Sequence, residues 1–169
     1  MTHGNVRRSL LSTEEERAIV REIAYRAVAN TAPEELAVFD DTAADFFDDP
    51  ASALDPKKRD EAVGFGLEIA LLTPYVIEAA IAAVRALGSI VMGAVKGEGE
   101  QYTRSLIRSL FHLPDPDGKP TSPAPLPLNP QQAQCVHDVA LSRARTLGLA
   151  EAQASILADA ITGGLVVAP

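Results

Sequence analysis

The residues of this sequence that could do chemistry are few, and their spacing does not suit catalysis. The chain of 169 residues has three histidines and one cysteine. Cys135 and His137 are two positions apart, which is about 200° around a helix, so they would face different directions and could not act as nucleophile and base. His3 and His112 have no companion at a catalytic spacing.

The common catalytic and cofactor motifs are also missing from the sequence. It contains no HExxH or ExxH pattern for a metal and no GxSxG nucleophile turn. Gly88 and Gly93 have the spacing of a phosphate-binding loop, but Ala94 and Val95 follow where that loop needs Lys and Ser or Thr. We therefore expect no catalytic residue, cofactor or metal. An enzyme whose site is assembled from distant residues is kept as an alternative.

Two opposite charges, Glu78 and Arg85, interrupt the most apolar part of the chain. Seven residues are nearly two helical turns, so the two side chains share a face about 10 Å apart and cannot pair with each other. An antiparallel second copy could match Glu78 with Arg85 in both directions, whereas pairing with other helices of the same chain is commoner. Gly93 and Gly97 continue this segment with a GxxxG spacing that permits close helix approach. These four residues are a candidate interaction or oligomer face.

A second candidate face is acidic and consists of Asp40, Asp41, Asp45 and Asp48. They fall opposite an apolar stripe in a predicted helix, so a solvated surface is the simpler interpretation and the docking of a basic partner is the next. The acids lack the alternating ligands and central glycine of an EF-hand loop.

The composition favours helices packed around one core. Hydrophobic residues make up 47% of the chain, aromatic residues only 5%, and Trp is absent. A balance of alanine and aliphatic residues suits closely packed helices better than sheets. The net charge of -8 opposes binding to nucleic acid, which depends on clustered Lys and Arg. A single cysteine and an N-terminus without a signal-peptide pattern predict a cytoplasmic protein.

Local start and stop signals divide the chain into three parts. Helical periodicity, caps and prolines predict an α-helical bundle over 10–111, a linker with seven prolines over 112–130, and a helical hairpin over 131–166. Limited proteolysis is expected to cut the linker first. The hairpin is too short to fold alone, so it must dock on the bundle, on another subunit or on a partner.

The predicted helices share a pattern of a cap or a proline at the start and an apolar stripe along one face. They span about 13–29, 33–47, 57–72, 74–96, 99–111, 130–147 and 150–162. The fold class that we predict is therefore all-α, with the bundle built around a central apolar helix.

The long apolar segment 65–96 has two interpretations. Its uncharged runs are too short to span a bilayer, which takes about 20 apolar residues, so a central core helix is favoured. Conditional insertion into a membrane after a change of conformation is the alternative, with Arg104 and Arg108 beside anionic headgroups. The sequence thus favours a non-catalytic helical module that binds a protein partner, with a homo-oligomer also considered and membrane contact only conditional.

Overall fold

The structure is a computed structural model, and it describes residues 13–55, 71–94, 100–116 and 127–169. These residues form an all-α fold of seven α-helices and one 3-10 helix, as the sequence predicts. In chain order the elements are α1 (Thr13–Thr31), η1 (Pro33–Val38), α2 (Phe39–Asp48), α3 (Pro50–Ala53), α5 (Thr73–Ala94), α6 (Glu100–Leu110), α7 (Pro130–Thr146) and α8 (Glu151–Thr162). The helix predicted over 57–72 lies almost entirely outside the described residues.

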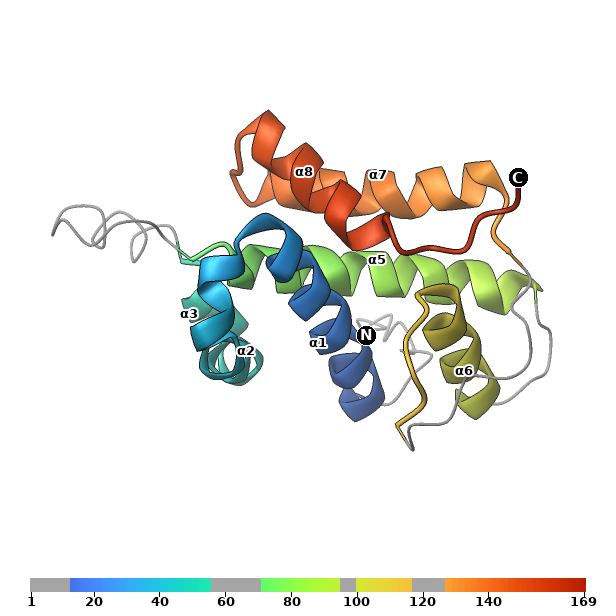
Figure 1. Cartoon of the computed structure of the whole chain (residues 1–169), viewed down its shortest axis with the longest axis horizontal. Coiled ribbons are helices and arrows are strands. Elements are labelled where there is room, and N and C mark those ends of the chain that lie inside the picture. Colours follow the sequence, from blue (N-terminus) through green and yellow to red (C-terminus); the bar gives the residue numbers. More distant parts are fainter. Residues whose placement is uncertain (1–12, 56–70, 95–99, 117–126) are drawn as a thin grey trace, which may run out of the picture.

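Helix α5 is the central element, and the other helices are arranged around it (Figure 1). It packs against α1, α2, α6, α7 and α8. Its core positions are apolar and mostly small, with Val76, Ala80, Ala83 and Leu87 almost fully buried. Alanines at such positions let neighbouring helices approach closely, which explains how one helix can contact five others. The prediction of a central apolar helix is confirmed.

The C-terminal hairpin docks on the same chain, which resolves one of the alternatives left open by the sequence. Helices α7 and α8 pack against each other and against α5, and α8 also packs against α1. The hairpin begins with a capping box in which the side chains of Asn129 and Gln132 each accept a backbone N–H. It turns at Gly148, whose φ of 89° favours a residue without a Cβ. A hydrogen bond from Arg145 closes the turn and lowers the pKa of Glu151.

The segment predicted as a linker is packed against the bundle at both of its described ends. Leu113, directly before Pro114, and Leu128, directly after Pro127, are both buried. The backbone of Leu128 pairs with the C-terminal tail: its N–H donates to Val166 at 3.0 Å, and its carbonyl accepts from Ala168 at 2.8 Å. The Val166 N–H donates in turn to Leu110 at 2.9 Å. The tail therefore ties the end of α6 to the start of α7, while residues 117–126 lie outside the described part.

The second predicted helix is divided in the structure. Its first turns form η1, a 3-10 helix, and only the part from Phe39 onward is an α-helix. The helix ends at Asp48, close to the predicted end at 47, and a further turn, α3, follows because the Asp49 side chain accepts the Ser52 N–H at 3.0 Å.

Candidate functional site

One side of α5 is only partly covered by the part of the chain that the structure describes. The residues on it are half-buried or exposed and recur at intervals of three and four, so they form a single stripe along the helix. The stripe contains Glu78, Ile81, Ala82, Arg85, Ala86, Ser89, Ile90 and Gly93. Three residues of the predicted interaction face, Glu78, Arg85 and Gly93, are therefore brought together on one accessible side, and Gly97 lies outside the described residues.

Both charges of the stripe are paired within the chain. Arg143 of α7 donates to Glu78 through its Nε at 2.9 Å and also through Nη2. Arg85 donates through Nε at 3.1 Å and Nη2 at 2.9 Å to Glu16 of α1. Both charges thus pair with other helices of the same chain, which is the commoner of the two arrangements expected. These pairs fix α7 and α1 as the two borders of the stripe.

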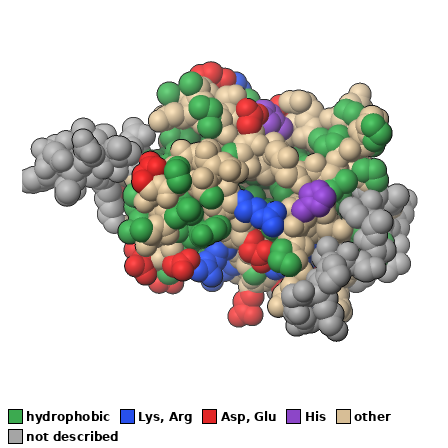
Figure 2. All heavy atoms as spheres, in the orientation of Figure 1, with side chains coloured by type: hydrophobic (Ala, Val, Ile, Leu, Met, Phe, Trp, Pro, Cys, Tyr) green, Lys and Arg blue, Asp and Glu red, His purple; other side chains and the backbone are tan. Residues whose placement is uncertain are grey.

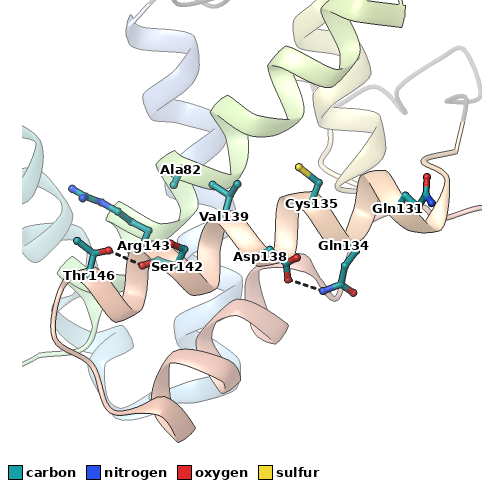
Figure 3. Close-up of a pocket in the computed structure, with 9 residues that line it drawn as sticks. All are labelled: Ala82, Gln131, Gln134, Cys135, Asp138, Val139, Ser142, Arg143 and Thr146. Atoms are coloured by element: carbon teal, nitrogen blue, oxygen red, sulfur yellow. Dashed lines mark hydrogen bonds between the residues drawn. The ribbon is translucent and has the colours of Figure 1, made fainter.

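A groove runs along the border with α7. Figure 3 shows α7 side chains lining it beneath Ala82 of α5. The groove has a volume of about 640 Å³ and is open to solvent. Its apolar members are Ala82, Cys135 and Val139, and polar or charged side chains complete the lining: Gln131, Gln134, Asp138, Ser142, Arg143 and Thr146. We call the α5 stripe together with this side of α7 the α5–α7 surface.

A smaller hollow of about 220 Å³ lies on the opposite border of the stripe, where α1 and α2 meet α5. Glu78, Ile81 and Arg85 contribute to it from α5. Phe47 of α2 also lines it, with the Arg17 guanidinium 5.4 Å from its ring centroid. The same stripe of α5 is therefore accessible from both borders.

The predicted acidic face lies at one end of the molecule, on α2. Asp40, Asp41, Asp45 and Asp48 are all exposed, and acidic side chains are visible at this end in Figure 2. Asp40 forms an ion pair with Arg21 at 2.6 Å. The helix buries Phe39, Ala43 and Phe46 on its other side, as predicted. This geometry fits a solvated face, and docking of a basic partner stays a prediction.

The structure also reveals a buried carboxylate that the sequence did not indicate. Glu35 of η1 is 6% exposed. Its carboxylate accepts the backbone N–H of Leu72 at 2.7 Å and both the N–H and the hydroxyl of Thr73 at 2.8 and 2.6 Å. A negative charge at the first turn of α5 satisfies N–H groups that have no partner inside the helix. Glu35 therefore anchors the start of the central helix.

Two arginines that the membrane hypothesis placed beside headgroups are engaged inside the protein. Arg104 pairs with Glu15, and Arg108, only 3% exposed, donates to Glu22 at 2.9 Å and to the carbonyl of Pro114 at 2.8 Å. In this conformation they hold α6 and the following residues against α1. Headgroup contact would therefore require α6 to leave the bundle.

The residues considered for catalysis are separated, as their spacing predicts. Cys135 is exposed and lines the groove, whereas His137 faces α8 and pairs through Nε2 with Asp159 at 2.8 Å. In the described part of the chain, no group of three His, Cys, Asp or Glu residues could hold a metal ion.

Searches against protein-family models, curated proteins and solved structures found no match to this chain. The candidate site therefore rests on the geometry of the α5–α7 surface.

Proposed function

We propose that this protein is a non-catalytic helical interaction module of the cytoplasm that binds a protein partner on the α5–α7 surface. The observation that carries the proposal is the partly accessible stripe on the central helix. A helix at the centre of a bundle usually presents its apolar side chains to its neighbours, yet Ile81, Ala86 and Ile90 stay partly accessible here. Accessible apolar groups with a polar rim are typical of docking surfaces.

The shape and chemistry of the surface suit a helix as the docking element. Ala82, Ala86, Ser89 and Gly93 are small, and a Cβ added at Gly93 would meet nothing within 4 Å. Small residues let a second helix come within about 8–10 Å of the first. On the α7 side, Gln131, Gln134, Ser142 and Thr146 supply polar groups for hydrogen bonds at the rim. With a net charge of -8, a protein is a more suitable partner than a nucleic acid.

Cys135 offers a direct test because it is the chain's only cysteine, is exposed, and lies in the groove. Relative to a thiol elsewhere on the same protein, Cys135 should be modified by a membrane-permeant maleimide several times more slowly in cells than in the purified protein, since the bound partner covers it. Protection by a second copy of the chain would slow both reactions alike.

The control is a Cys135→Ser variant carrying Ala152→Cys, which moves the only thiol to an exposed position on α8. Because cellular thiols also consume maleimide, the rate at Cys135 is divided by the rate at this control position measured in the same setting. An equal ratio of the two rates in cells and after purification would contradict the proposed docking surface.

Conditional membrane insertion is a second candidate function, and one specific observation favours it. Helix α5 has 22 residues, a mean hydropathy of 1.7 over its most apolar window, and only half of that window buried. At 1.5 Å per residue its length is about 33 Å, enough to cross a hydrocarbon core. The core helix of a water-soluble bundle has the same properties, so a protein-binding role is placed first.

A further inference from the structure

We infer that one occupant of the α5–α7 surface is a second copy of this chain, bound so that the two α5 helices cross antiparallel about a two-fold axis near Ile81 and Ala82. The inference rests on the proposed function and names a partner for it. Such an axis lies midway between Glu78 and Arg85 along the helix. Glu78 then faces Arg85 of the other copy, and Arg85 faces Glu78.

Charge complementarity is the first argument for this partner. Among the described residues, both hydrogen bonds to Glu78 end on Oε1, and both from Arg85 leave from Nε and Nη2. Glu78 Oε2 and Arg85 Nη1 can therefore bond across the axis without breaking either pair inside the chain. The Arg85 side chain is 66% exposed, so it extends far enough to reach another molecule.

The side chains at the centre of the contact and along its border with α7 also suit pairing with an identical copy. Ala82 is opposite Ile81 of the other copy, which puts a small residue against a larger one at the point of closest approach. The same axis sets α7 beside α7 of the second copy. The groove lining on α7 has only two charged groups, Asp138 and Arg143, and Arg143 is already paired with Glu78. No cluster of like charges in the groove lining on α7 therefore repels α7 of the second copy.

Charge reversal tests the two-fold arrangement by sedimentation velocity at micromolar concentrations. Wild type should sediment in part as a dimer. Glu78→Arg and Arg85→Glu each put like charges opposite one another twice, so each variant alone should raise the dimer dissociation constant at least about tenfold. An equimolar mixture of the two variants should dimerise again. In the mixed dimer the arginine introduced at position 78 of one chain faces the glutamate introduced at position 85 of the other, and the two unchanged residues, Arg85 and Glu78, also face each other.

A purely structural role for these residues predicts the opposite result in the mixture. Each variant loses one pair inside its own chain, to Arg143 or to Glu16, and mixing cannot restore that pair. If thermal unfolding shows that either variant is not folded, Ala82→Glu replaces it as the test. A carboxylate at the axis should weaken the dimer at least about tenfold, whereas Ala152→Glu on α8 should leave it unchanged.

Two outcomes would overturn the inference: wild type that stays monomeric throughout, or folded variants whose mixture stays monomeric while wild type dimerises. Neither outcome would remove the proposed function, because slow modification of Cys135 in cells would still report a different protein on the same surface.

Discussion

Replacement of Glu35 by alanine should lower the free energy of unfolding by about 3 kcal/mol. The change removes the carboxylate that accepts two backbone N–H groups and the Thr73 hydroxyl at the start of α5. Thr73 is fully buried, so its freed donors would have no access to water in the folded bundle. Chemical denaturation, monitored by far-UV circular dichroism, measures this loss in the free energy of unfolding.

Glu34→Ala is the matched control for this prediction. Glu34 precedes Glu35 in the same 3-10 helix and is exposed, so its loss should change the free energy of unfolding by less than about 0.5 kcal/mol. Glu35→Gln should fall between the two, since the amide keeps one acceptor oxygen but loses the charge. A loss for Glu35→Ala no larger than that for Glu34→Ala would show that Glu35 does not anchor α5.

Replacement of Ala83 by aspartate should lower the free energy of unfolding by at least about 3 kcal/mol, a large part of the stability of a domain of this size. Ala83 is fully buried on the side of α5 that faces the core. A carboxylate there would have to be buried without a partner or force the helices apart. Ser89→Asp adds the same charge on the exposed stripe of the same helix and should cost little.

The same pair of variants separates the two candidate functions. If α5 is only a core helix with a docking stripe, wild type should not release the contents of anionic liposomes at neutral or acid pH. If α5 inserts, wild type should cause release, and both aspartate variants should abolish it because each adds a charge to the inserted part of the helix, which costs up to about 3 kcal/mol at the bilayer centre on insertion scales. Release by wild type that is lost in the folded Ser89→Asp variant would favour the membrane function over protein binding.

The helices and their buried faces could be predicted because their signals are local. Asn129 before Pro130 forms the capping box at the start of α7, and Pro74 marks the restart at α5. The apolar stripe of α2 and the exposure of its aspartates follow from the helical period alone. The placement of Glu78, Arg85 and Gly93 on one side of α5 follows from the same period.

The partners of the polar groups could not be predicted, because they are distant in sequence. Glu35 binds residues 37 and 38 positions away, and Glu78 binds Arg143 across 65 positions. No local pattern marks a glutamate that will cap another helix, so Glu35 resembled any acid in a first turn. The packing of Leu128 against the tail was missed for a similar reason, since prolines indicate where helices stop and not what the chain next to them contacts.

The groove on α7 is a third feature that needed the structure. Gln131, Cys135 and Ser142 are ordinary residues for one side of a helix, and nothing in their spacing distinguishes a docking surface from a solvated one. They belong to a candidate docking surface only because α7 borders the stripe on α5 and leaves it partly accessible.

The most direct test of the α5–α7 surface is photo-crosslinking in cells from a benzophenone amino acid placed at Ala82. Ala82 lies at the centre of the surface and lines the groove. A matched variant carries the same amino acid at Ala152, which is exposed on α8. We expect Ala82 to give discrete protein adducts that the Ala152 variant lacks, with the mass of two chains where a second copy is bound and another mass where a different partner is bound. Adducts to lipid alone, or the same protein adducts from both positions, would contradict the account that this surface docks a protein.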